Sequence, residues 1–434
     1  MRIKGKQIDN PLSGLSFNLQ ELSGGLADIG VMVPIVAALI LNNGFNPTAV
    51  LLVFALTYIG AGLYYRLPIP VQPLKAMAAI AIAQGLSPEV VSAAGLIMGV
   101  VLLTLGVTGA IGPIAKLFPR PIVRGIQVAV GLLLVRAGFE LWSGPQVVRD
   151  GSDVFVSLAG LAVPAGTIIA VLLGGILLFT LWQRKLPATL LVLVPALVIG
   201  VFAGSLATMG GLALGPDLPQ VSLPDGGLLA TALVVLVIPQ LPLTLGNAVI
   251  ACTDTAHSYF GREAQRVNHR SLLLTTGTAN LLVGSIGGMP VCHGSGGLTA
   301  HYRFGARTGG ATIMLGAVLL VLALVFGASA VQLFGLIPLP ALGVLLTAVG
   351  VQHALFARDT RPGLEWMVVG LIAAVSLITS NLAIGFGSGI VLYQVATQGR
   401  RVMSHALGWG QRRLGSSPAP HPPSGATGYG RRTN

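Results

Sequence analysis

Prolines interrupt an apolar stretch at Pro68-Ile-Pro-Val-Gln-Pro-Leu-Lys75, and the good helix formers Ala-Met-Ala-Ala-Ile-Ala-Ile-Ala follow at 76–83. A second stretch, Met289-Pro-Val-Cys-His-Gly-Ser-Gly-Gly-Leu298, is also irregular at first and potentially helical afterwards. Each predicts an extended segment that leads into a short helix, because proline suits the first helical turn. Broken backbone of this kind is tolerated at membrane depth only when protein buries it or it lines a cavity.

The composition places these stretches in a membrane protein. Hydrophobic residues make up 53% of the 434 residues and charged residues 9%, whereas soluble domains carry about 25% charge. The net charge is +12, but the basic residues lie singly between apolar runs rather than on one polar face, which excludes a nucleic-acid binder. Two cysteines indicate neither a disulfide framework nor a zinc site. The chain is therefore predicted to be an all-α polytopic membrane protein.

Apolar runs between charge or turn signals predict fourteen transmembrane elements. They are 20–41, 47–65, 71–85, 90–112, 121–142, 164–182, 187–206, 228–252, 270–287, 290–303, 310–330, 338–354, 364–379 and 381–398. Two of them, 71–85 and 290–303, are shorter than the roughly 20 residues that a spanning helix needs. We expect these two, the third and the tenth, to be half-helices.

The basic residues predict the orientation. With the N-terminus in the cytoplasm, 22 of the 25 Lys and Arg fall in cytoplasmic loops or ends, as the positive-inside rule requires. The first 18 residues lack the apolar segment of a cleavable signal peptide. We therefore expect a multi-pass protein of the cell (inner or plasma) membrane with both termini in the cytoplasm.

An internal repeat divides the chain in two. At an offset of 219, Asp28 matches Asn247, Pro119-Arg-Pro121 matches Pro338-Leu-Pro340, and Ala129-Val-Gly131 matches Ala348-Val-Gly350. Seven elements per half is an odd number, so the second half enters the membrane from the opposite side. This 7+7 inverted repeat predicts alternating access around a midplane site.

The predicted segments are a cytoplasmic N-terminus, the first repeat, an extracytoplasmic linker, the second repeat, and a disordered basic cytoplasmic tail. Their ranges are 1–19, 20–206, 207–227, 228–398 and 399–434.

An anion site is predicted where the two half-helix N-termini meet. Each N-terminus offers free N–H groups and about half a positive charge, and Gly294, Gly296 and Gly297 allow close approach of a ligand. Lys75, with Gln72, is expected to add positive charge and hydrogen bonds. The alternative is that Lys75 snorkels to the surface or pairs with Asp28 or Glu21.

The other polar residues of the apolar segments have separate predicted roles. Glu21 and Asp28 are proton-coupling candidates, with an interfacial glutamate and a packing aspartate as the alternative. Gln240, Asn247 and Ser295 would supply neutral hydrogen bonds, and Pro239 and Pro242 would kink their helix. His293 would bind the anion or cap the turn. No metal site is expected, since no cluster has suitable spacing.

Four motifs resemble a known family, the molybdate transporters related to sulfate permeases. The motifs are Glu21-Leu-Ser-Gly-Gly-Leu-Ala-Asp28, Pro70-Val-Gln-Pro-Leu-Lys75, Gln240-Leu-Pro-Leu-Thr-Leu-Gly-Asn247 and Met289-Pro-Val-Cys-His293-Gly-Ser-Gly-Gly-Leu-Thr-Ala-His-Tyr-Arg-Phe-Gly305. The resemblance covers about residues 15–400. It implies core and gate domains, with the substrate between the third and tenth elements. By analogy the core contains elements one to four and eight to eleven.

The resulting hypothesis is a secondary active transporter that imports a tetrahedral oxyanion, molybdate, without a cofactor. Sulfate is the closest alternative, followed by a nucleobase on the same fold and an uncoupled anion channel. A nucleobase site would favour carboxylates on the eighth and tenth elements, where this chain has Asn247 and no acid between 289 and 305. No catalytic constellation is spaced for an enzyme. The sequence leaves open a proton or sodium co-substrate and a homodimer.

Overall fold

The computed structural model describes residues 14–115, 118–149, 151–158, 160–183, 188–205, 212–217 and 224–414. The chain forms two units, Met1–Gly389 and Ile390–Asn434. The second unit contains the C-terminal part of a helix that begins at Leu382 and ends at Leu414. Most of the predicted N-terminal segment 1–19, and parts of the predicted linker 207–227, lie outside the described residues.

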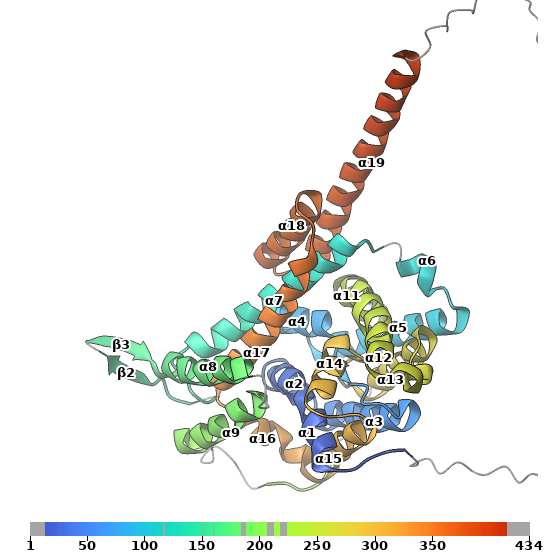
Figure 1. Ribbon diagram of the computed structural model, residues 1–434. Helices are drawn as coiled ribbons and strands as arrows, with labels where there is room; N and C mark the ends of the chain where they lie inside the picture. Colours follow the sequence, from blue (N-terminus) through green and yellow to red (C-terminus); the bar gives the residue numbers. More distant parts are fainter. Residues whose placement is uncertain are drawn as a thin grey trace, which may run out of the picture. The chain divides into compact units, whose positions relative to one another are not determined.

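The first half of the chain is mainly helical (Figure 1). Its elements are α1 (Leu19–Gly25), the 3₁₀ turn η1 (Leu26–Asp28), α2 (Ile29–Asn43), α3 (Pro47–Tyr65), β1 (Gln72–Pro73), α4 (Lys75–Gln84), α5 (Pro88–Thr108), α6 (Ile111–Ala115), α7 (Arg120–Ser143), β2 (Phe155–Leu158), β3 (Leu161–Pro164), α8 (Ala165–Gln183), α9 (Ala188–Gly200) and the π-helical turn η2 (Val201–Ser205).

The second half is built in the same way. Its elements are α10 (Gly226–Thr231), the π-helical η3 (Ala232–Val237), α11 (Ile238–Leu243), the π-helical η4 (Thr244–Ala251), α12 (Cys252–Phe260), η5 (Gly261–Arg266), α13 (His269–Ile286), β4 (Val291–Cys292), α14 (Ser295–Arg303), α15 (Gly310–Phe326), η6 (Gly327–Ser329), α16 (Ala330–Gly335), α17 (Leu339–Ala354), η7 (Leu355–Asp359), α18 (Leu364–Thr379) and α19 (Leu382–Leu414).

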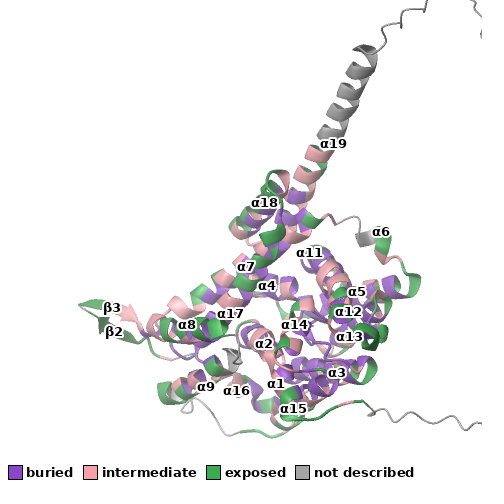
Figure 2. Ribbon diagram, in the orientation of Figure 1, coloured by how far each residue is buried: buried purple, intermediate pink, exposed green. Residues whose placement is uncertain are grey.

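Eight helical segments of the described residues are long and apolar enough to cross a membrane. They are Leu19–Asn43, Pro47–Tyr65, Pro88–Thr108, Arg120–Ser143, Ala165–Gln183, Gly226–Arg266, Gly310–Gly335 and Leu339–Asp359. Shorter apolar helices occur at Lys75–Gln84, Leu191–Ala203, Leu364–Thr379 and Leu382–Gln398. The described residues are mostly helical, with two short two-stranded sheets, and the apolar helices fit a membrane protein. The count of fourteen elements and the two half-helices stay predictions. Figure 2 shows exposed residues along α8. Phe179 and Trp182 on this helix are 55% and 76% exposed, as suits a helix that faces lipid.

Local sequence signals explain several helix ends. Asn46 accepts a hydrogen bond from the Ala49 amide and caps α3, with Pro47 in its first turn. Gly85 ends α4 in the left-handed conformation at φ 62°, which glycine adopts without steric cost. The predicted kink at Pro239 and Pro242 takes a specific form: α11, which carries both, is flanked by η3 and η4. Each proline lacks an N–H group, so the helical hydrogen bonds rearrange around it.

The two irregular stretches pair with each other. β1 and β4 are antiparallel, with Gln72 opposite Cys292 and Pro73 opposite Val291. The Leu74 amide donates to the carbonyl of Pro290 over 2.9 Å and extends the pairing. Each strand leads directly into a short helix, α4 or α14, as the sequence predicts.

Close glycine contacts hold α7 against α17, which lie side by side in Figure 1. A Cβ atom at Gly131 would lie 2.5 Å from the carbonyl oxygen of Gly350, and a Cβ atom at Gly350 would lie 2.5 Å from that of Gly131. Both helices start after a proline, Pro119 or Pro338, in nearly the same backbone conformation. Small residues at such crossings let membrane helices approach closely.

The backbone of 399–414 is helical as part of α19, which differs from the disorder predicted for the tail 399–434. The segment contains helix formers and no proline before Pro418, so nothing in it stops the preceding helix. Residues 415–434 lie outside the described residues.

We expect Gly350→Ala to destabilise the protein by about 1–3 kcal/mol, because the new methyl group would meet the α7 backbone. Gly370→Ala is the matched control, since a Cβ atom on this exposed α18 residue meets nothing within 4 Å. Thermal unfolding of the purified protein in detergent measures both. Equal unfolding midpoints for the two variants would contradict the tight crossing.

Candidate functional site

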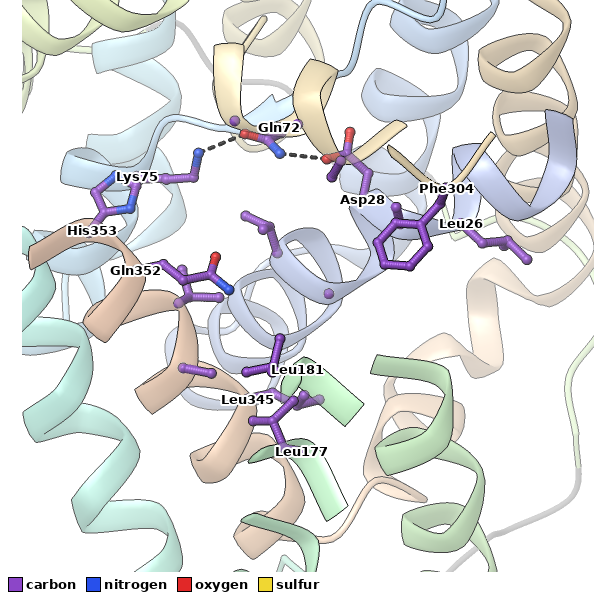
Figure 3. A pocket seen from close by; sticks show the side chains of 18 of the residues that line it. Leu26, Asp28, Gln72, Lys75, Leu177, Leu181, Phe304, Leu345, Gln352 and His353 are labelled. Carbon is purple, nitrogen blue, oxygen red and sulfur yellow. Dashed lines mark hydrogen bonds between the residues drawn. The ribbon is translucent and has the colours of Figure 1, made fainter. Parts of the chain in front are cut away.

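A cavity of about 190 Å³ lies between two groups of elements in the Met1–Gly389 unit. One wall comes from η1, α2, β1, α4 and α14, and the other from α8, α17 and η7. Its polar side chains are those of Asp28, Gln72, Lys75, Gln352 and His353 (Figure 3). The remaining lining is largely apolar, which suits a site where a few polar groups fix the ligand's orientation.

Lys75 is the first residue of α4 and borders the cavity. Its Nζ donates to Gln72 Oε1 over 2.6 Å, and Gln72 Nε2 donates to Asp28 Oδ1 over 2.5 Å. Figure 3 shows this chain along one side of the cavity. Lys75 thus connects to Asp28 through Gln72, and no ion pair within 4.0 Å joins Lys75 to a described carboxylate. The alternative of a direct pair with Asp28 or Glu21 is not the arrangement observed.

A second, smaller cavity lies beside Lys75. Lys75 and His353 border both cavities, and Gln127, Thr244 and Asn247 line the smaller one. Asn247 Oδ1 accepts a hydrogen bond from Ser295 Oγ over 2.7 Å, so the two predicted residues meet. Lys75 therefore faces polar side chains from both halves of the chain.

The glycines that begin α14 bring its backbone against the Gln72–Asp28 pair. A Cβ atom at Gly297 would lie 2.5 Å from Gln72 Nε2 and 2.8 Å from Asp28 Oδ1, and one at Gly294 would lie 2.5 Å from Gln72 Oε1. Gly296 and Gly297 line the larger cavity. The first amides of a helix have no intrahelical acceptor, so this N-terminus presents positive potential to the cavity wall.

Gln240 has another role than the predicted contact with a ligand. Its Oε1 accepts hydrogen bonds from the amides of Ala76 and Met77, at 2.9 and 3.2 Å, and its Nε2 donates to Thr244. The side chain therefore satisfies the N-terminus of α4. The sequence predicted an anion at the start of α4, but the Gln240 side chain caps this helix start.

Glu21 and His293 also form hydrogen bonds with backbone groups. Both Glu21 oxygens accept from the amides of Arg307 and Thr308, at 3.0–3.2 Å. His293 lies between the Pro70 carbonyl, 2.9 Å from Nδ1, and the Thr275 hydroxyl, 3.0 Å from Nε2. Neither residue lines the two cavities described above.

Sequence reasoning missed several buried or cavity-lining polar residues: Tyr58, Gln127, His301, Gln352 and His353. A signal was present for the last two, because Gln352 and His353 are adjacent polar residues at the end of an otherwise apolar segment, and such residues inside membrane segments are commonly functional. Within the described part of the chain, no group of three or more His, Cys, Asp or Glu side chains is arranged to hold a metal ion.

The fold has a counterpart among solved transmembrane domains. It matches the transmembrane domain of the cyanobacterial bicarbonate transporter BicA with a TM-score of 0.63 at 17% identity, covering 86% of this chain and 96% of that chain.

The family follows from sequence. The family described as molybdate transporters of the MFS superfamily matches residues 20–134 and 232–353. Molybdate transporter 2 of Arabidopsis thaliana is 32% identical over 422 residues, 89% of this chain and 88% of that protein. Molybdate transporter 1 of Chlamydomonas reinhardtii is 30% identical over 487 residues, with coverage of 90% and 93%. The chain belongs to the molybdate transporter family, which confirms the resemblance read from the motifs.

We expect Gly297→Ala to weaken ligand binding at least tenfold, because the methyl group would displace the Gln72–Asp28 pair. Gly60→Ala is the control, since a Cβ atom on this exposed α3 residue would meet nothing within 4 Å and the residue lines neither cavity. Binding of molybdate to the purified variants measures the difference. Similar affinities for both variants would show that this close approach is unimportant.

Proposed function

We propose that the protein is a secondary active transporter that imports a tetrahedral oxyanion, molybdate, through the cavity between α4, α14 and α17. The observation that carries the proposal is Lys75: its ammonium group borders both cavities and is held by a neutral glutamine rather than paired directly with a carboxylate. A half-buried cation without a direct carboxylate partner retains attraction for an anion. Membership of the molybdate transporter family supports the choice of anion.

The proposed site combines Lys75 with neutral hydrogen-bond donors. The amides of Gly296 and Gly297 lie on the cavity wall, where they would donate to anion oxygens as helix N-termini do in other anion sites. Gln352 and His353 reach the same cavity from the opposite wall. Asn247 and Ser295 would contribute from the smaller cavity beside Lys75. Gln240 and His293 belong to the supporting framework in this proposal.

We also propose a 7+7 inverted repeat with half-helices at α4 and α14. The packing supports it. The repeat would relate α3 to α13 and α5 to α15, so it would convert a contact of α3 with α15 into a contact of α13 with α5. Both contacts occur. Gly131 and Gly350, which touch each other, are 219 residues apart. The offset of 219 also takes Gln72 to Val291 and Pro73 to Cys292. It therefore converts the pair of Gln72 and Cys292 into the pair of Pro73 and Val291.

Alternating access would operate between the two walls. The cavity borders the C-terminal ends of α8, α14 and α17, which lead toward basic loops predicted to be cytoplasmic. On its other side, apolar residues of α2, α8, α9 and α17 pack into one cluster that includes Ala37, Leu173, Val192 and Leu342. This cluster would close the extracytoplasmic route, so the structure corresponds to an inward-facing state in this proposal.

The hypothesis also covers the competing substrate, the coupling ion and the location of the protein. Sulfate has the same charge and shape as molybdate and is the closest competing substrate. Uptake would use a proton or sodium gradient, the protein would lie in the cell membrane with both termini in the cytoplasm, and it would not act as an enzyme. An uncoupled channel would instead give steady currents that exceed the turnover of a carrier.

We expect Lys75→Met to reduce molybdate uptake into proteoliposomes by at least tenfold, because the cavity loses its one lysine charge while the apolar stem is preserved. Arg358→Met is the control, since this exposed η7 residue lines neither cavity. Radiolabelled molybdate, with sulfate and uracil as competitors, measures uptake and selectivity. Undiminished uptake by Lys75→Met removes the role given to the lysine, and no saturable uptake by the unmodified protein under either gradient removes the transporter proposal.

A further inference from the structure

His301 of α14 is fully buried and lies between two hydrogen-bond acceptors. Its Nδ1 is 2.9 Å from the carbonyl oxygen of Pro68. A carbonyl oxygen only accepts, so Nδ1 must carry the hydrogen of this bond. In a neutral imidazole the other nitrogen, Nε2, then has a lone pair and no hydrogen.

That lone pair faces a carboxylate. Nε2 lies 3.4 Å from Asp28 Oδ2, and the two side chains are 0% and 1% exposed. Among the described residues, Nε2 has no hydrogen-bond partner. Two acceptors that face each other without water repel, and leaving either one unsatisfied is costly. The arrangement becomes favourable when one additional proton lies on Nε2 or on the carboxyl group.

The other hydrogen-bond partners of Asp28 do not place a proton between Asp28 and His301. Tyr58 OH donates to Oδ2 over 2.6 Å and Gln72 Nε2 donates to Oδ1 over 2.5 Å. Both bonds stabilise the charged carboxylate, but neither supplies a hydrogen between Oδ2 and the imidazole. His293 provides a contrast within the same region, because its Nε2 meets a threonine hydroxyl, which can donate or accept.

We propose that Asp28 and His301 together hold one exchangeable proton, and that its binding strengthens the binding of the oxyanion at Lys75. The inference rests on the proposed function and specifies its coupling ion and the residues that carry it. With the proton bound, the dyad of Asp28 and His301 is neutral overall. Without it, the dyad carries one negative charge on the wall of the anion cavity.

The hydrogen-bond chain explains how the charge would act on the anion. Asp28 holds Gln72, and Gln72 holds the ammonium group of Lys75. A dyad that has lost its proton repels the anion and draws the positive charge of Lys75 toward the cavity wall. Because coupling between two binding sites is reciprocal, the bound anion must in turn favour the protonated dyad. Proton and anion would therefore load together.

Other titratable groups lie on the elements of the dyad or on neighbouring elements and must be separated from it by experiment. They are Glu21 on α1, Tyr58 on α3, Lys75 on α4, Asp254 and His257 on α12, His293 beside β4, Tyr302 and Arg303 on α14, and His353 on α17. Glu21 and His293 have the backbone and hydroxyl partners described above. Of this set, Lys75 and His353 line the larger cavity.

The test measures molybdate affinity of the purified full-length protein in lipid nanodiscs between about pH 6 and pH 9. We expect the unmodified protein to lose affinity as the pH rises, by up to about tenfold per pH unit once the dyad releases its proton. Asp28→Asn and His301→Gln each place a non-titrating N–H donor between the two positions. The affinity of both variants should no longer follow the pH. His293→Gln is the matched control and should keep the slope of the unmodified protein.

A second measurement needs no variant. Calorimetry of molybdate binding in two buffers with different ionisation enthalpies reports the protons taken up with the anion, and we expect up to one per molybdate. Binding with no proton uptake at any pH would falsify the dyad, as would a preserved pH slope in both His301→Gln and Asp28→Asn. Absence of molybdate binding to the unmodified protein at every pH would instead overturn the proposed function itself.

Discussion

The structure depends on how two broken backbone segments are satisfied where water is scarce. β1 and β4 pair with each other, and the side chain of Asn280 on α13 bonds to both the amide and the carbonyl of Val291. In an apolar interior an unpaired peptide group costs several kcal/mol. Each segment thus requires the other, and the pairing fixes where α4 and α14 begin.

The positions of these two helix starts restrict the hydrogen-bond partners that the amides at each start can have. Gln240 occupies the amides at the start of α4, whereas glycines open the start of α14 toward the cavity. The two helix N-termini, which the repeat makes equivalent in sequence position, therefore have different partners. Asp28 and its counterpart Asn247 differ in the same way: one carries charge beside the larger cavity and the other a neutral amide beside the smaller one.

Burial of charge explains which sequence interpretations were too simple. Glu21 was a proton-coupling candidate because a buried carboxylate can titrate near neutral pH, but two backbone amides already use its oxygens. His293 attracted attention through its glycine-rich motif, yet both of its ring nitrogens have partners. His301, six residues beyond the Ser295 that starts α14, lies inside the motif 289–305, but the sequence assigned it no role. Its importance comes from facing Asp28, which lies 273 positions earlier.

The sequence by itself determined the membrane class, the irregular segments with their short helices, and the family, and it predicted a site that contains Gln72 and Lys75. These features follow from local composition, periodicity and motifs, which the chain carries regardless of its packing. Only the tertiary structure decided that Gln72 joins Lys75 to Asp28, that Gln240 caps α4, and that Gln352 and His353 complete the cavity from α17. Hydrogen-bond partners distant in sequence are chosen by helix packing, and a single sequence does not encode that choice in any local pattern.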